Sequence, residues 1–207
     1  MTEQPPLLNL GAWMERSWAN GPGERYVLWL QGCLLRCPGC CNVDFLPQEP
    51  RHMVSIDEMA RRICYIVGIE GVTYTGGEPT LQAQALALLS EQLRPVGLTV
   101  VCYTGYTLEE LRARDDLWIE RLLANTDILI DGPYRQEEAA SLRWRGSRNQ
   151  RIHYLTPAYR DLVNTEGPAE VEFAVGDQGF TTTGTWPAGF LERLQQVLAA
   201  TKTKSYP

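Results

Sequence analysis

The sequence lacks long apolar runs, a surplus of basic residues and more than two histidines. No stretch approaches the roughly 20 apolar residues of a membrane-spanning helix, and the start has no basic segment leading into an apolar core as a signal peptide would. Acidic residues outnumber basic ones, 25 to 19. Because nucleic acids and anionic lipids are bound by basic surfaces, these absences predict a cytoplasmic protein with no nucleic-acid partner and no membrane partner.

The six cysteines are crowded rather than dispersed. Three stand between Cys33 and Cys40 and a fourth follows at Cys41, which is typical of a metal site and not of a disulfide framework. At 207 residues the chain is long enough for one substantial core. We therefore expect one domain over residues 1–207, with a core at about 20–155 and a C-terminal extension at about 156–207.

Strands and helices are predicted to alternate along the first two thirds of the chain. Apolar or β-branched runs predict strands at 25–30, 71–75, 98–103 and 126–130. Helical spacing of apolar residues predicts helices at about 55–67, 81–93 and 107–114. Repeated strand–helix units favour an α/β fold with a mostly parallel sheet, open or curved into part of a barrel.

The last third of the chain is less regular. The polar, arginine-rich segment at 136–151 is interpreted as a loop or a partly ordered flap. Residues 171–175 and 179–183 are predicted to form a hairpin, residues 187–200 a closing helix, and the final TKTKSYP a frayed tail.

The spacing Cys33-x3-Cys37-x2-Cys40 directly follows the first predicted strand. Three thiolates on a four-iron cube leave one iron without a protein ligand, so this loop favours a [4Fe-4S] cluster with an open iron. A zinc site or reduced core cysteines are the alternatives. Zinc sites usually close four ligands with a second C-x2-C pair or a histidine cluster, and the sequence offers neither.

A second motif, Thr75-Gly76-Gly77-Glu78-Pro79, ends the next predicted strand. Its glycines allow close approach of the main chain to a ligand, and Glu78 offers a carboxylate. The cysteine loop followed by this turn resembles the radical S-adenosylmethionine (SAM) superfamily, which implies a partial (βα)6-type barrel. The resemblance also implies that the open iron chelates the amino and carboxylate groups of SAM, and that Gly76, Gly77 and Glu78 form the turn beside the SAM amino group.

Further motifs are similar to those of the activating proteins of anaerobic ribonucleotide reductase, a glycyl-radical enzyme activase family. They are Asn20-Gly-Pro-Gly23, Trp29-Leu-Gln-Gly-Cys33, Cys37-Pro-Gly-Cys40, Tyr103-Thr-Gly-Tyr106, Asp131-Gly-Pro133 and Arg145-Gly-Ser-Arg-Asn-Gln-Arg151. By this resemblance SAM adenine lies against Gly39, Cys40 and Cys41, with Thr104 and Asp131 facing the same site. The family commonly has His where this chain has Cys41, which we interpret as lining the pocket.

Several residues have both a functional and a structural interpretation. Asp131 is either a SAM contact or a turn residue before Gly132. Arg145, Arg148 and Asn149 are candidate partner contacts, or part of a solvated face. Cys64 and Cys102 are interpreted as packed core thiols, and His52 and His153 as surface or hydrogen-bonding residues rather than metal ligands.

The resemblance implies an oxidoreductase. A flavodoxin- or ferredoxin-like donor reduces the cluster, SAM is cleaved to methionine and a 5′-deoxyadenosyl radical, and a hydrogen is taken from a glycine of a glycyl-radical partner enzyme. One alternative is a radical SAM enzyme that modifies a small molecule or a peptide. An alternative of another class is a docking module organised by a structural metal site.

Overall fold

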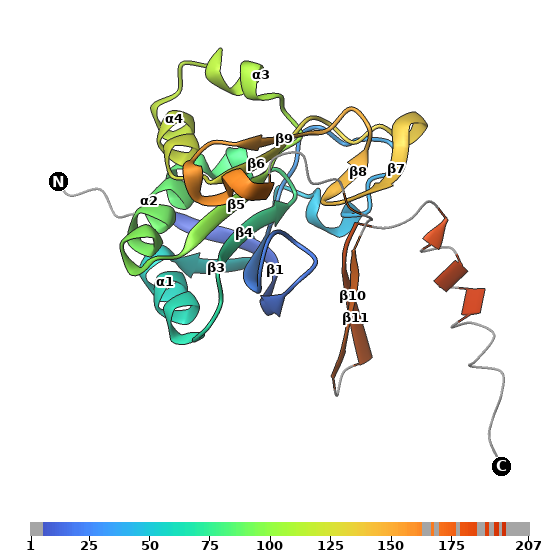
Figure 1. The fold of residues 1–207 in the computed structure, drawn as a ribbon, viewed down its shortest axis with the longest axis horizontal. Helices are drawn as coiled ribbons and strands as arrows, with labels where there is room; N and C mark the ends of the chain where they lie inside the picture. The colour runs from blue at the N-terminus through green and yellow to red at the C-terminus, as the bar shows by residue number, and fades with distance from the viewer. Residues whose placement is uncertain are drawn as a thin grey trace.

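The computed structural model describes residues 6–162, 167, 170–176, 179–185, 189–190, 193–194 and 196–197 (Figure 1). A seven-stranded sheet in the order β3-β1-β2-β4-β5-β6-β9 forms its centre. The strands β2, β4, β5 and β6 are parallel neighbours, whereas β1, β3 and β9 run antiparallel to the strands beside them. Their bounds are β1 Leu7–Ser17, β2 Arg25–Leu30, β3 His52–Ser55, β4 Gly71–Gly76, β5 Thr99–Tyr103, β6 Ile128–Asp131 and β9 Arg151–Tyr154.

Helices connect the parallel strands and cover one face of the sheet. Figure 1 shows α1, α2 and α4 gathered on one side of the strands. Helix α1 begins where the Ser55 hydroxyl accepts a hydrogen bond from Glu58 N at 3.2 Å, and it buries Met59 and Ile63. The α-helices are α1 Ile56–Tyr65, α2 Ala83–Leu93, α3 Leu108–Arg112 and α4 Leu117–Ala124. The 3-10 helices are η1 Val43–Phe45, η2 Pro79–Gln82, η3 Arg94–Val96, η4 Gln136–Glu138 and η5 Pro157–Leu162.

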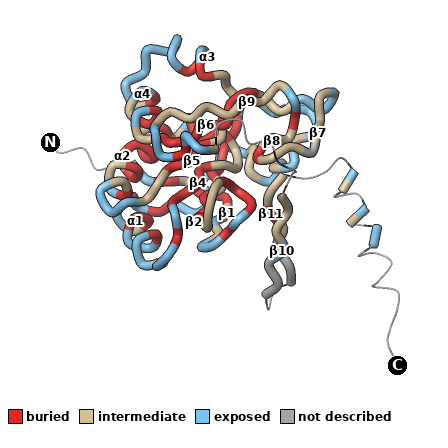
Figure 2. Tube along the Cα trace, viewed as in Figure 1, coloured by how far each residue is buried: buried red, intermediate tan, exposed pale blue. Residues whose placement is uncertain are grey.

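The opposite face of the sheet carries a second, smaller core. Val101, Ile128 and Ile130 pack there against Trp144 and Tyr159. Trp144 belongs to the connection between β7 (Ala139–Leu142) and β8 (Arg145–Ser147), and Tyr159 to η5. Burial on both faces explains why the parallel strands read as continuous apolar runs (Figure 2).

A hairpin of β10 (Val171–Gly176) and β11 (Gly179–Gly184) projects from the body of the molecule (Figure 1). Its base is fixed to the segment after β1. The Glu172 carboxylate accepts from the Ser17 hydroxyl at 2.6 Å and from Trp18 N at 3.0 Å. Asn20 Nδ2 donates to Thr183 Oγ1 at 2.8 Å.

The predicted α/β class, its four parallel strands and the C-terminal hairpin are confirmed. The prediction of a loop at 136–151 is wrong, because that segment contains η4, the β7–β8 hairpin and the start of β9. The segment pairs with itself and with β6, a longer-range partner that local polarity does not reveal. Cys64 is exposed and is not a core thiol, since it lies on the outer face of α1.

Other expectations fall outside the description. Most of the predicted helix at 187–200 and all of the tail at 201–207 lie outside the described residues. In the part of the chain that the structure describes, no helix has the length and apolar character needed to cross a membrane.

Candidate iron–sulfur and cofactor site

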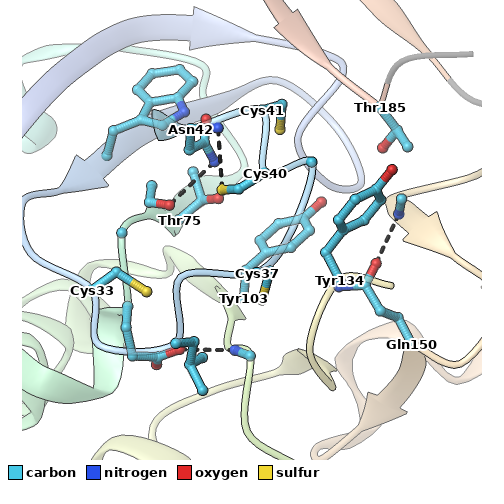
Figure 3. Close-up of a pocket in the computed structure, with 18 of the residues that line it drawn as sticks. Cys33, Cys37, Cys40, Cys41, Asn42, Thr75, Tyr103, Tyr134, Gln150 and Thr185 are labelled. Atoms are coloured by element: carbon cyan, nitrogen blue, oxygen red, sulfur yellow. Dashed lines mark hydrogen bonds between the residues drawn. The ribbon is translucent and has the colours of Figure 1, made fainter. Parts of the chain in front are cut away.

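The carboxyl ends of the parallel strands surround a pocket of about 320 Å³. Cys33, Cys37 and Cys40 line it from the loop after β2, and Cys41 lines it beside them (Figure 3). The predicted cofactor residues Gly39, Gly76, Gly77, Glu78 and Thr104 line the same pocket. The fold therefore brings the three ligand candidates and most of the predicted SAM residues to one place.

The cysteine loop is fixed at its start by hydrogen bonds to η1 and to the residue after it. Gly32 N donates to Phe45 O at 2.8 Å, and Cys33 N donates to Leu46 O at 3.0 Å. Within the loop, Cys40 N donates to Cys37 O at 3.1 Å. Figure 3 shows Cys33 and Cys40 reaching the pocket from different sides. The loop thus folds around the pocket and presents its thiols inward.

The chemistry of these thiols suits a bound cationic cluster. Burial raises the pKa of Cys37 and of Cys40, and nearby thiolates raise it further: that of Cys33 for Cys37, and those of Cys33 and Cys37 for Cys40. Asn42 N, which donates to Cys40 Sγ at 3.4 Å, opposes this increase. A cationic centre removes the repulsion between adjacent thiolates, so the residues fit a group that is bound through several sulfurs at once. Among the described residues, no three His, Cys, Asp or Glu side chains are grouped so as to hold a single metal ion, so the three thiols share one pocket without converging on one point.

The two glycines of the second motif let β4 end directly against the cysteine loop. Gly77 N donates to Leu30 O at 2.8 Å, and a Cβ at Gly77 would lie 2.3 Å from Gly32 O. Gly76 has φ +101°, a conformation that residues with a side chain rarely adopt. Asn42 Nδ2 donates to Gly76 O at 3.2 Å. The close approach couples the position of this turn to the position of the cluster ligands.

Glu78 is buried, with 1% of its surface exposed, and it joins the ends of β4 and β5. Its Oε1 accepts from Thr80 N at 2.9 Å, from Thr80 Oγ1 at 2.6 Å and from Thr104 Oγ1 at 2.9 Å. Its Oε2 accepts from Gly105 N at 2.8 Å. Burial raises the pKa of Glu78, and these four donors oppose the increase. Glu78 therefore lines the pocket while it holds two strand ends together.

Asp131 is fully buried, and its carboxylate is directed to a different set of partners. Its Oδ2 accepts from Leu108 N at 2.7 Å and from Arg151 at 2.6 Å, and it lies 2.9 Å from His153 Nε2. Burial acts to raise the pKa of Asp131, but the Arg151, Leu108 and His153 contacts outweigh it and the pKa is lowered. The adjacent Gly132, and not Asp131, lines the pocket.

The three partner-contact candidates Arg145, Arg148 and Asn149 do not line the pocket. Arg148 is exposed, and Asn149 Nδ2 donates to Pro133 O at 2.7 Å. The neighbouring Gln150 does line it, and Gln150 Oε1 accepts from Gly146 N at 2.8 Å.

Sequence reasoning missed a group of lining residues. Trp29 and Tyr103 belong to strands of the sheet, so their periodicity was a usable signal. The others come from segments whose place in the fold only long-range contacts determine. Among the missed residues are Trp29, Asn42, Tyr103, Tyr134, Trp144, Gln150 and the run Thr182–Thr185.

Comparison with known proteins identifies the family. Residues 19–153 match the model of the 4Fe-4S single cluster domain. The anaerobic ribonucleoside-triphosphate reductase-activating protein of Vibrio cholerae is 34% identical over 146 residues, covering 66% of this chain and 92% of the relative. That of Pasteurella multocida is 35% identical over 154 residues, covering 66% and 91%. The pyruvate formate-lyase-activating enzyme of Staphylococcus aureus is 30% identical over 165 residues, covering 69% and 66%.

The chain belongs to the radical SAM activase family. The match to the domain model includes the cysteine loop, the G-G-E turn and the ends of β5 and β6, which are the elements that surround the pocket. It ends at residue 153, so the β10–β11 hairpin lies outside it. The pocket wall is therefore built partly from the family domain and partly from a segment beyond it.

Proposed function

We propose that this activase holds one [4Fe-4S] cluster on Cys33, Cys37 and Cys40 and binds SAM at its open iron. Its product is a glycyl radical on a partner enzyme. The observation that carries the proposal is the meeting of the three thiols with Gly76, Gly77 and Glu78 around one pocket. The sheet, with four parallel strands, is then the partial barrel of the superfamily.

Held by Cys33, Cys37 and Cys40 and reduced by an external donor, a cluster would supply the one electron needed to cleave bound SAM to methionine and a 5′-deoxyadenosyl radical. The tasks of the chain are to bind, orient and exclude water. The turn at Gly76 and Gly77, fixed against the cysteine loop, orients the methionyl end, and Glu78 stabilises that turn through Thr104 and Gly105. The main chain at Gly39, Cys40 and Cys41 offers the adenine contacts.

Asp131 acts in this proposal as a positioning residue. It holds the start of α3 through Leu108 N and fixes β9 through Arg151, and so sets the position of the Gly132 turn that lines the pocket. The electron comes from a flavodoxin- or ferredoxin-like donor, in the cytoplasm. The peptide-modifying alternative uses the same cofactor site with a different hydrogen donor.

Replacement of single cysteines tests the ligand set. Anaerobically reconstituted wild-type protein should carry about one four-iron cluster per chain, and Cys37→Ala should lose its iron and its charge-transfer absorption because one of three ligands is gone. Cys102→Ala is the matched control, since Cys102 is buried in β5 and does not line the pocket. Iron retained by Cys37→Ala at the wild-type level would remove the proposed ligation.

The partner is tested by electron paramagnetic resonance. Reduced protein mixed with SAM and a recombinant glycyl-radical enzyme should give a carbon-centred doublet on the partner. Without the partner, the same mixture should give uncoupled SAM cleavage and no doublet. A doublet that never forms, with SAM cleavage intact, would favour the peptide or small-molecule alternative.

A further inference from the structure

The pocket must admit a stretch of polypeptide, if the proposed function is right. A glycine carries no side chain that a pocket could grip. Its position beside the cofactor must therefore be set by contacts to the main chain on either side of it. Main-chain recognition of an extended segment is commonly achieved by an exposed strand edge.

The structure presents such an edge at the pocket. Four consecutive residues, Thr182–Thr185, line it. Thr182, Thr183 and Gly184 end β11, and Thr185 follows it. Successive side chains of a strand point to opposite faces, so a consecutive run beside one cavity is the arrangement expected when a strand turns its edge to that cavity. In the part of the chain that the structure describes, β11 pairs with β10 and with no other strand.

The hydrogen-bond pattern of the hairpin shows which groups are free to bind. Thr185 N donates to Glu170 O at 2.9 Å, and this pair continues the register of β10 and β11. Bonded and non-bonded pairs alternate along an antiparallel ladder, so Thr183 and Glu172 form the next bonded pair. Thr182, the next residue beyond this pair, faces Phe173 in a non-bonded pair, so its N–H and C=O turn away from β10. Thr182 thus offers a donor and an acceptor at the outer edge.

The hairpin is held firmly enough to serve as a template. Thr183, on the same strand, accepts from Asn20 at 2.8 Å and is 4% exposed. Glu172 of β10 is bound by Ser17 and Trp18. Asn20 also lines the pocket. The edge is therefore fixed in place relative to the pocket.

Trp144 also lines the pocket, and two of its features are typical of a ligand-binding residue. Its φ is +57°, which is strained for a bulky side chain. Its indole Nε1 is shielded from solvent and has no hydrogen-bond partner among the described residues. A buried donor without an acceptor is costly, and an incoming carbonyl that reaches it by a small shift of the indole would relieve that cost.

We propose that the outer edge of β11, at Thr182, receives the main chain beside the target glycine as an added strand, and that Trp144 Nε1 donates to one of its carbonyl oxygens. The hairpin lies outside the region matched by the family model and Trp144 lies inside it, so this subsite joins a segment beyond the family domain to the shared cofactor pocket. The occupant is an extended, glycine-bearing segment of the partner polypeptide. Flat main-chain pairing accounts for recognition of a residue that has no side chain.

The test uses reconstituted full-length protein with SAM and an oxidised cluster, so that no turnover occurs. The probe is a capped nine-residue peptide of alanine and serine with one central glycine, and its Kd is measured by NMR titration. Thr182→Pro removes the outward N–H without removing a bond to β10, and Thr182→Ala is the control that keeps it. Thr182→Pro should raise the Kd roughly fivefold to tenfold, as expected for one lost hydrogen bond, while Thr182→Ala changes it less than twofold.

Trp144→Phe keeps an aromatic side chain at this position and removes the indole N–H. It should raise the Kd by a similar factor and leave the affinity for SAM unchanged, whereas Trp118→Phe on α4 changes neither. An unchanged peptide Kd would remove the indole from the subsite. A loss of SAM affinity would place Trp144 in the SAM site instead.

A third measurement needs no variant. Methylation of single amides of the peptide should weaken binding at alternate residues only, because an added strand bonds through every second residue. Equal Kd values for Thr182→Pro and Thr182→Ala, uniform effects of methylation, or no peptide binding by the wild type would each overturn the proposal.

The proposed function is judged separately, by the doublet on the intact partner. If the doublet forms but the variants and the methylated peptides show no such effects on the Kd, the subsite is wrong and the activase function stands. If the peptide binds but the doublet does not form, the activase function is wrong.

Discussion

The two ends of the parallel strands each bury a charged side chain, but they use it differently. At the amino end, Arg25 is fully buried and its hydrogen-bond acceptors are neutral. They are Pro22 O, Val72 O and Thr99 O, at 2.8 to 3.0 Å, and the hydroxyls of Thr73, Thr99 and Tyr159, at 2.9 to 3.2 Å. At the carboxyl end, Glu78 is buried among neutral donors and also lines the pocket.

The difference shows what a buried charge contributes at each end. Space around Arg25 is filled, since a Cβ at Gly71 would lie 2.0 Å from Thr99 O and 2.7 Å from Arg25. Burial lowers the pKa of Arg25, yet a guanidinium stays protonated, so this end keeps a fixed charge at all ordinary pH. Glu78 has a raised pKa, so its charge depends on pH. The strands are thus joined at the amino end by a charge that does not change with pH, and at the carboxyl end by a charge that does.

Arg25→Met should have the largest effect on stability. It removes all six hydrogen bonds that the Arg25 guanidinium donates to buried carbonyl and hydroxyl oxygens, and we expect a loss of roughly 3–5 kcal/mol in the free energy of unfolding. Urea denaturation of the metal-free protein measures it. Arg135→Met, which removes an exposed ion pair with Glu138, is the control and should cost less than about 1 kcal/mol. Similar losses of unfolding free energy in both variants would show that Arg25 does not stabilise this end of the sheet.

Glu78→Gln should have an intermediate effect, of roughly 1–3 kcal/mol at neutral pH, because Gly105 N loses its acceptor. Its pH dependence is the sharper result. A carboxyl whose pKa is raised on folding holds its proton more tightly in the folded state, so wild-type stability falls as pH rises from the ordinary value of 4.5 through the raised pKa. Glu78→Gln should flatten this fall. Urea midpoints measured from pH 4.5 to 8 would reveal parallel curves if Glu78 does not titrate this way.

The smallest effects should come from a matched pair of threonines. Thr73→Val removes one acceptor from Arg25, and Thr104→Val removes one donor from Glu78. Each should cost about 1 kcal/mol. The loss in Thr104→Val should grow from pH 5 to pH 8, since the lost bond supports the charged carboxylate, whereas the loss in Thr73→Val should stay constant. Urea denaturation at pH 5 and pH 8 measures both losses. If the two variants show the same pH dependence, the two ends of the strands do not differ in the way described.

Much of this arrangement was predictable from local sequence. The apolar runs predict the four parallel strands β2, β4, β5 and β6. The spacing of the cysteines predicts the ligand loop with Cys33, Cys37 and Cys40. The antiparallel strand β1 was not predicted, because its apolar residues do not alternate regularly with polar ones: its register shifts between Leu10 and Ala12 and again between Met14 and Ser17. Helix α4 was missed as well, although Asp116 caps it at Trp118 N.

Long-range partners account for the rest. The position of Asp131 depends on Arg151, 20 residues away, and no local pattern shows that its carboxylate turns from the pocket. The contribution of Thr182–Thr185 to the pocket depends on contacts with residues near the start of the chain. Spacing predicts which residues share a loop or strand end, but not which distant segment covers them.

The anchoring of the β10–β11 hairpin has a consequence for how the protein is made. Its three ties join residues separated by 154, 155 and 163 positions in the sequence. Contacts of such high sequence separation close late, and during synthesis they wait until the hairpin has left the ribosome. The family domain at 19–153 is complete in the nascent chain well before then. During translation the cysteine thiols thus lie in a pocket that is open on one side, and the hairpin completes its wall after the family domain has been made.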